Sequence, residues 1–152
     1  MADVHPIIRT KLQPPVIGPD ILPRSQLIER LENGRYRKLT LISAPAGYGK
    51  SILASQWLEA AGSPSAWLSL DEHDNDPGIF LSYFFDASRT IFPQIFAETA
   101  DLLAGLHLPA PQTLATSLAN EAAGIPERCL LVLDDYHLIQ NQEVHQIVAT
   151  LI

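Results

Sequence analysis

Hydrophobic and polar residues alternate along the chain in a pattern that predicts short strands separated by helices. The apolar spacing within 25–34 predicts a short amphipathic helix, which Asn33-Gly34 ends. Apolar or β-branched runs at 38–43, 66–70 and 129–133 predict three strands. The third run is wholly apolar, which is typical of a central parallel strand covered on both faces.

Helices are predicted after each of these strands. The segment 51–61 ends at Gly62, and Asp76-Pro77 supplies an N-cap with proline at the first helical position. Strands that alternate with helices predict an α/β fold with parallel strands. The remaining predicted helices cover 94–106, 112–123 and a segment that begins near Gln142.

The first 24 residues are predicted to form an extended arm before a single domain at 25–152. Proline fixes φ and lacks a backbone donor, so this stretch favours neither a helix nor a central strand. The arm contains Pro6, Pro14, Pro15, Pro19 and Pro23.

The segment APAGYGKS, from Ala44 to Ser51, matches the phosphate-binding pattern GxxxxGK[ST] except at Ala44, which replaces glycine. Gly47 and Gly49 permit backbone N–H groups to face phosphate oxygens, Lys50 reaches the β- and γ-phosphates and so serves catalysis, and Ser51 binds Mg²⁺. The alternative is a glycine-rich turn with an incidental lysine. The residues expected to bind nucleotide here are Ala46, Gly47, Tyr48, Gly49, Lys50, Ser51 and Ile52.

Two aspartates follow the third apolar run. Parallel sheets bind ligands at the carboxyl ends of their strands, so Asp134 is expected to orient Mg²⁺ beside the phosphate loop. Asp135 is the candidate base that positions an attacking water. His137 could reach the γ-phosphate region, but a solvated loop histidine is an equal alternative.

Other polar and aromatic candidates are weaker. Asp71, Asp74 and Asp76 lack the remaining ligands and glycine spacing of a calcium loop, so a solvated acidic turn is favoured over a cation site. Trp57 and Trp67 fit a core or an interface better than a ligand cage. The remaining histidines show no metal-ligand spacing and are predicted to be surface residues: His5, His73, His107 and His145.

Composition narrows the classes of function. The chain has 152 residues, with 10 Lys+Arg against 17 Asp+Glu and a net charge of −7, which argues against a general nucleic-acid binder. Its one cysteine, Cys129, cannot form an internal disulfide, and no apolar stretch is long enough for a membrane span. We therefore expect a cytoplasmic protein.

Five segments resemble, in order, the nucleotide-binding domain of MalT-like LuxR-type transcriptional activators, which are STAND-class signal-transduction ATPases. The resemblance runs from about Thr10 to the end of the chain and includes the alanine-first loop; that family commonly carries threonine where this chain has Ser51. The segments are TKLQPP at 10–15, LPRSQLIERL at 22–31, LTLISAPAGYGKS at 39–51, AWLSLDEHDNDPGIF at 66–80 and LLVLDDYHLI at 130–139.

The resemblance implies a three-layer P-loop NTPase fold of the ASCE/STAND type and a switch driven by ATP and ADP. In such proteins ADP holds an inactive monomer, and the ATP form self-associates and activates transcription before hydrolysis resets the switch. Contact with DNA is made through a C-terminal domain absent from this sequence. By similarity, Arg24, Ile21 and Leu22 lie where these ATPases cradle adenine and ribose.

The family's ATPase core continues past the acidic strand to a sensor strand, which inserts between the phosphate-loop strand and the acidic strand. We therefore expect a truncated piece with an incomplete core and little or no ATP turnover. A competing P-loop layout places the acidic strand directly beside the loop strand. Two other functions stay open: a small P-loop kinase acting on a metabolite, and a protein-interaction module with a vestigial nucleotide site.

Overall fold

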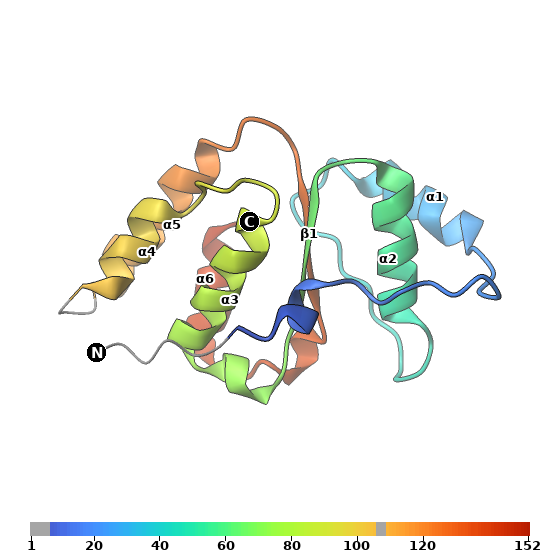
Figure 1. The fold of residues 1–152 in the computed structure, drawn as a ribbon, viewed down its shortest axis with the longest axis horizontal. Coiled ribbons are helices and arrows are strands. Elements are labelled where there is room, and N and C mark those ends of the chain that lie inside the picture. Colours follow the sequence, from blue (N-terminus) through green and yellow to red (C-terminus); the bar gives the residue numbers. More distant parts are fainter. Residues whose placement is uncertain (1–6, 106–108) are drawn as a thin grey trace.

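The computed structural model describes residues 7–105 and 109–152 and is built around a small parallel sheet with helices on both sides (Figure 1). Strand β1 (Ser65–Ser69) pairs with β2 (Leu130–Asp134), in register from Ser65 opposite Leu130 to Ser69 opposite Asp134. The prediction of an α/β fold with parallel strands is therefore confirmed.

The helices fall into two groups, one on each face of the sheet (Figure 1). The first group is α1 (Ser25–Gly34) and α2 (Lys50–Ala61), and the second is α3 (Pro77–Arg89), α4 (Ala97–Ala104), α5 (Pro111–Ala123) and α6 (Gln142–Thr150). Three short 3-10 turns are η1 (Arg9–Leu12), η2 (Glu72–Asn75) and η3 (Tyr136–Leu138).

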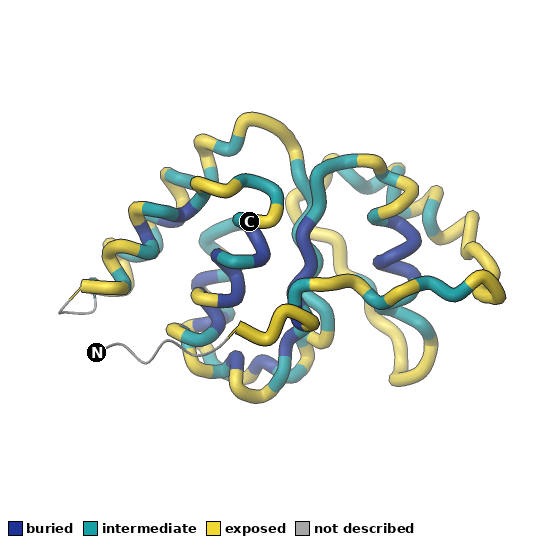
Figure 2. The backbone as a smooth tube through the Cα atoms, viewed as in Figure 1, coloured by how far each residue is buried: buried dark blue, intermediate teal, exposed yellow. Residues whose placement is uncertain are grey.

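The two sheet faces are buried by different helices because successive strand side chains point in opposite directions. Ala66 and Leu68 of β1 belong to the main apolar core, together with Phe80 and Phe84 of α3. Trp67 points to the other face, that of α2, where Trp57 is also buried. Figure 2 shows the buried stretches on β1, α2 and α3. Of the two predicted settings for the tryptophans, core or interface, the structure shows the core.

The predicted strand at 38–43 is wrong for this structure. Across the described ranges, this segment makes no strand pairing with β1 or β2, and Leu39 and Leu41 are 59% and 81% exposed. A strand requires a neighbouring strand for its backbone groups, and 38–43 has none in the described ranges. The competing layout, with the acidic strand directly beside the loop strand, is not seen either, since 38–43 makes no pairing with β2 on the edge that β1 leaves open.

The arm lies along the opposite edge of the sheet from β2, where η1 packs beside β1 (Figure 1). It is extended apart from η1 and a turn at 18–21, where the Ile21 N–H donates to the Gly18 carbonyl oxygen, a local difference from the predicted arm. The helix predicted at 94–106 begins only at Ala97, because Phe96 takes a left-handed conformation with φ 56°. Residue 106, the predicted last residue of this helix, lies outside the described residues. The same is true of His5 and His107, which were predicted to be surface residues. No helix in the described ranges is long and apolar enough to cross a membrane.

Candidate functional site

The phosphate-loop sequence forms a tight turn at the start of α2. Gly47 and Gly49 have φ of 81° and 74°, a region that glycine adopts without steric cost. Gly49 is the N-cap residue of α2, and no side chain in the described part of the chain caps this helix. The N–H groups of the first helical turn are therefore available to an anion, at the positive end of the helix dipole.

Lys50 is folded back onto the loop. Its Nζ donates to the carbonyl oxygens of Ala44 at 2.9 Å and Pro45 at 3.2 Å. The ammonium group is thus held at the mouth of the turn, within the same segment as the helix N-terminus. A phosphate bound by the loop would meet both a row of N–H donors and this positive charge.

Ser51 and Asp134 meet although 83 residues separate them. Ser51 Oγ donates to Asp134 Oδ1 at 3.0 Å, which joins the first turn of α2 to the end of β2. Asp134 shares its sheet face with Val132, opposite Trp67 in the register, so the alternation of the strand directs its carboxylate toward α2. A hydroxyl and a carboxylate oxygen in contact are the kind of ligands that Mg²⁺ takes.

Asp135 lies next to this pair at the rim of the site. It is exposed, has φ 57°, and its backbone N–H donates to Asp134 Oδ1 at 3.1 Å. His137 Nδ1 lies 3.8 Å from Asp135 Oδ1, and the His137 side chain is largely exposed. The structure therefore brings both predicted acids to the loop's end of the sheet and places His137 beside the second one.

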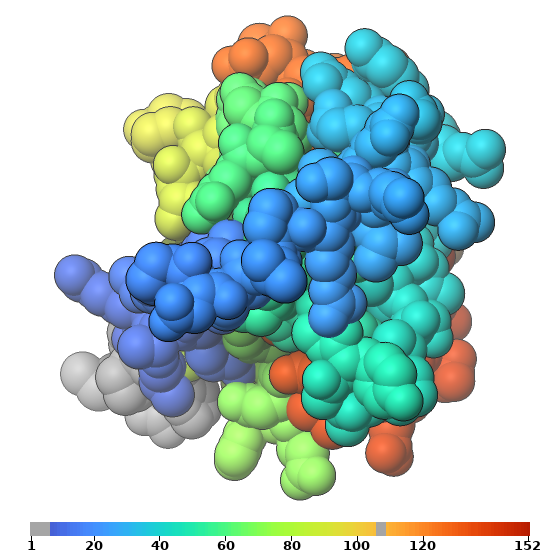
Figure 3. Space-filling view, turned by 90° about the vertical axis from the view of Figure 1, so that its right-hand side faces the viewer, coloured from blue at the N-terminus to red at the C-terminus, as the bar shows by residue number. Residues whose placement is uncertain are grey.

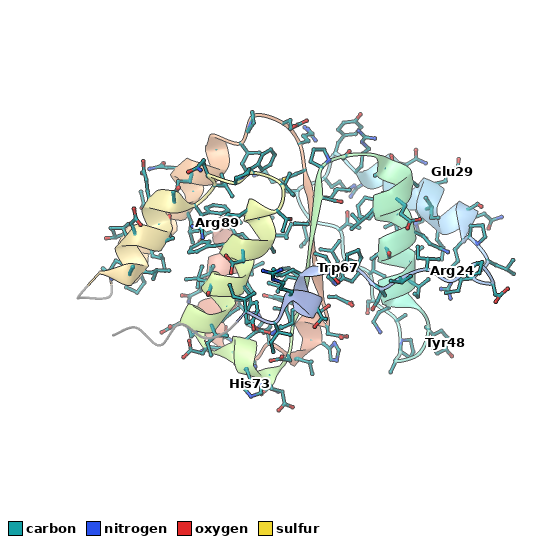
Figure 4. The ribbon with its side chains drawn as sticks, in the orientation of Figure 1. Arg24, Glu29, Tyr48, Trp67, His73 and Arg89 are labelled. Atoms are coloured by element: carbon teal, nitrogen blue, oxygen red, sulfur yellow. The ribbon has the colours of Figure 1, made fainter. Side chains whose placement is uncertain are left out.

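Arg24 connects the arm to the phosphate loop. Its Nη1 donates to the Tyr48 carbonyl oxygen at 2.8 Å, and a β-carbon at Gly49 would lie 2.9 Å from Arg24 Nη2. Figure 4 labels the Arg24 and Tyr48 side chains on the same side of the molecule as α2, at the right of the view. Ile21 and Leu22 precede Arg24 and are exposed at 38% and 84%. Of the other predicted loop residues, Ala46 is exposed and Ile52 is half-buried.

The acidic turn after β1 is solvated only in part, which corrects the prediction: Asp76 is exposed and Asp71 is half-buried, but Asp74 is buried. Asp74 is fully buried, and its Oδ2 accepts from Lys11 Nζ at 2.5 Å and from the Asp71 N–H at 2.7 Å. No group of three or more potential metal ligands occurs among the described residues. Asp76 caps α3 as predicted, since its Oδ1 accepts from the Ile79 N–H at 3.0 Å.

Lys11 also stabilises the charged form of the Asp71 carboxyl. Desolvation by burial raises the pKa of the Asp71 carboxyl, but hydrogen bonds from Lys11 and from the His73 N–H outweigh it, and the pKa lies below its ordinary value of 3.8. His73 itself is exposed, as predicted. The turn therefore holds a buried ion pair with its positive partner in the arm.

His145 is not a free surface residue, which corrects a further prediction. Its Nδ1 lies 2.7 Å from the Tyr136 hydroxyl, and the ring is half-buried against Tyr136. Burial raises the pKa of the Tyr136 hydroxyl. Burial and the nearby Glu127 charge likewise raise the pKa of the half-buried Cys129 thiol.

Sequence reasoning missed three polar residues that organise the site from a distance. Lys11 lies in the arm, Gln56 in α2, and Asn75 in the turn after β1; each has hydrogen-bond partners more than 30 residues away. No local pattern marks them, because their partners are adjacent only after folding. The one sequence signal near any of them was the turn-forming composition of 71–76, which contains Asn75.

Comparison with known proteins gives several relatives. The chain is 37% identical over 141 residues to the HTH-type transcriptional regulator MalT of Cronobacter sakazakii, and 33% identical over 140 residues to MalT of Vibrio parahaemolyticus. It is also 34% identical over 139 residues to the serine/threonine-protein kinase PknK of Mycobacterium tuberculosis. No protein-family model matches the chain.

These alignments cover 92%, 91% and 90% of the chain but only 15%, 15% and 12% of the three relatives. The similar region is thus a small part of much longer proteins, and it occurs in proteins with two different names. The chain is therefore similar to a short segment of MalT regulators and to a short segment of PknK.

Proposed function

We propose that this chain is the ATP- and ADP-binding switch portion of a MalT-like transcriptional regulator of the STAND class, with a P-loop NTPase core. The contact between Ser51 Oγ and Asp134 Oδ1, at 3.0 Å across 83 residues, carries the proposal. A glycine-rich turn with an incidental lysine has no reason to meet an acidic strand end. A nucleotide site that uses Mg²⁺ requires this meeting.

Each residue has a role in this proposal. The N–H groups of 46–52 and the Lys50 ammonium bind phosphate, while Ser51 and Asp134 hold Mg²⁺, which neutralises charge on the phosphate oxygens. Asp135, at the rim, orients an attacking water. Arg24, Ile21 and Leu22 lie at the loop side of the arm and cradle the adenine and ribose.

The activity of the longer protein belongs to the same proposal. Nucleotide exchange and slow hydrolysis switch the parent between an inactive and a self-associated form, in the cytoplasm. DNA contact is assigned to another part of the parent, since this portion carries a net charge of −7 and DNA-binding surfaces cluster Lys and Arg. The chain on its own binds nucleotide with little or no turnover.

The test is titration calorimetry of ADP and ATP with Mg²⁺. Lys50→Ala removes the ammonium that faces the bound phosphates, and we expect affinity to fall about tenfold or more, equal to roughly 1.4 kcal/mol or more. Lys38→Ala, which removes an exposed lysine before the loop, serves as the matched control and is expected to bind like the unmodified chain.

Unchanged binding in Lys50→Ala would contradict the assignment of the loop. Absence of binding by the unmodified chain, together with a dimer in light scattering, would favour the interaction module instead. Phosphate transfer to a member of a metabolite panel would favour the kinase.

A further inference from the structure

We propose that the arm, residues 7–24, is a strap that holds the phosphate loop against the acidic strand, with Lys11 as a positioning residue remote from the nucleotide. The inference rests on the proposed function of the loop. It assigns a role to a buried lysine that touches neither the loop nor the two aspartates at the end of β2.

The first anchor of the strap is Lys11. Its side chain is 10% exposed, and its Nζ lies 2.5 Å from Asp74 Oδ2 and 3.1 Å from Asp71 Oδ2. The same ammonium lies 4.3 Å from the centre of the Tyr83 ring, and the Tyr83 hydroxyl accepts from the Ile8 N–H at 3.3 Å. A cation this deeply buried is held by its partners, because an unpaired charge there would be costly.

The second anchor joins the far end of the arm to α2. Ser55 Oγ donates to the Pro15 carbonyl at 3.1 Å, and Gln56 Nε2 donates to the Leu22 carbonyl at 3.3 Å. Gln56 Oε1 accepts from the Arg24 N–H at 3.4 Å, beside the contact of Arg24 with Tyr48. Figure 3 shows the arm crossing the surface of this side of the molecule.

The first anchor is also connected to the loop that follows Asp134 and Asp135. Lys11 binds the turn that contains Asn75, and Asn75 Oδ1 accepts from the N–H groups of Gln140 at 2.6 Å and Asn141 at 3.0 Å. Asn75 Nδ2 donates to the Leu138 carbonyl at 3.0 Å. Through this residue the turn is fixed to the loop that follows Asp134 and Asp135.

The strap matters because few other polar contacts join the segment 25–61, which carries the phosphate loop, to β2 and its flanking loops. The segment 38–43 is not paired with β2, so no sheet ladder connects the phosphate loop to the acidic strand. Within the described ranges, the side-chain hydrogen bonds that link 25–61 directly to β2 and its flanking loops are Ser51 to Asp134 and Arg128 to the Tyr36 carbonyl, the latter at 3.4 Å. The arm adds a third connection with both ends fixed.

The test separates the Mg²⁺ contribution from phosphate binding. Mg²⁺ requires Ser51 and Asp134 together, whereas phosphate requires only the loop and α2. We therefore measure ADP affinity with Mg²⁺ and with EDTA, and expect Lys11→Met to lower the Mg²⁺ enhancement about three- to tenfold. Affinity in EDTA is expected to stay close to that of the unmodified chain. Lys11→Arg should recover part of the enhancement, and Arg9→Met, an exposed cation on the same turn, should retain all of it.

A variant at the other end tests the same strap independently. Gln56→Leu keeps the side-chain volume but removes both hydrogen bonds to the arm, and it too is expected to lower the Mg²⁺ enhancement. If the arm acts as one unit, the double variant is no worse than the more affected single variant. Additive losses, or an enhancement unchanged in both single variants, would overturn the strap.

Hydrogen exchange without nucleotide separates this inference from the proposed function. In Lys11→Met, faster exchange is expected in peptides that cover Ser51–Gln56, although Lys11 does not contact α2. Change confined to peptides around 8–12 and 71–76 would overturn the strap, even if nucleotide binds. If the unmodified chain binds no nucleotide, the proposed function fails, while this exchange result still decides whether the arm positions α2.

Discussion

Asp134 and Asp135 are adjacent and identical, yet the backbone gives them different positions. Asp134 is the last residue of β2, so its side chain shares the face of Val132 and meets Ser51. Asp135 leaves the strand with φ 57°, a region that Asp tolerates better than most residues, and its carboxylate lies at the exposed rim. One carboxylate therefore meets the Ser51 hydroxyl and the other faces solvent.

Asp71 predicts a small pH-dependent stability. A carboxyl whose pKa is lowered by folding adds stability above its unfolded value of 3.8, and that stability is lost as pH falls through the folded pKa. We expect Asp71→Asn to lower the free energy of unfolding at pH 7 by no more than about 1 kcal/mol, because the side chain is 46% exposed.

Urea denaturation of Asp71→Asn and the unmodified chain at pH 7 and near pH 3 measures this effect. The asparagine keeps the oxygen that accepts from the His73 N–H, so the comparison measures the loss of the charge together with the acceptor that faces Lys11. The difference should shrink at the lower pH, and Asp101→Asn, at an exposed position in α4, should show little effect at either pH. A difference that grows on acidification contradicts the assignment.

At the scale of elements, helices α2 and α3 begin in different ways. The start of α2 has no side-chain cap and is formed by the phosphate loop, whereas α3 begins with a capping aspartate and Pro77. α3 buries Phe80 and Phe84 in the main core, so its first turn supports much of the acidic half of the molecule. The first turn of α3 is therefore satisfied by its own cap, whereas the first turn of α2 leaves its N–H groups available to an anion.

The cap of α3 gives a stability prediction. Asp76→Ala removes the acceptor for the Ile79 N–H and should cost about 1 kcal/mol, which lowers the melting temperature by roughly 2–4 °C for a chain of this length. Thermal unfolding followed by circular dichroism measures the shift, and Asp101→Ala is the matched control. An unchanged melting temperature would mean that the cap contributes nothing to the folded state.

At the scale of the whole molecule, the loop segment and the sheet differ in how their backbone groups are satisfied. β1 and β2 bond to each other and are flanked by helices on both faces, whereas 38–43 has no regular secondary structure, is mostly exposed and is unpaired with either strand. Exchange of backbone amides with solvent follows the opening of such bonds. The two segments should therefore exchange at very different rates.

We expect amide hydrogen exchange to be fast at Leu39–Ser43 and slow across β1, β2 and the centre of α3. Mass spectrometry of the unmodified chain over a time course measures both sets of peptides in one experiment, with α3 as the internal reference. Protection of 39–43 equal to that of β1 would show that this segment is paired in solution.

Local sequence patterns were enough to place most elements of the fold. Helices α1, α2 and α5 and strands β1 and β2 begin and end within a residue or two of their predicted bounds, and α3 and α6 begin where predicted. Caps, prolines and glycines act within a few residues, and apolar periodicity reports directly which face is buried. The loop and both acids could be identified as site candidates for the same reason.

The sequence by itself determined the order and type of these elements and the chemistry available at the loop and the strand end. Only the tertiary structure decided that 38–43 is unpaired, that Ser51 meets Asp134, and that Lys11 is buried against Asp74. The physical reason is distance along the chain. A strand, an ion pair or a metal site needs partners supplied by other segments, and their identity depends on how the elements pack.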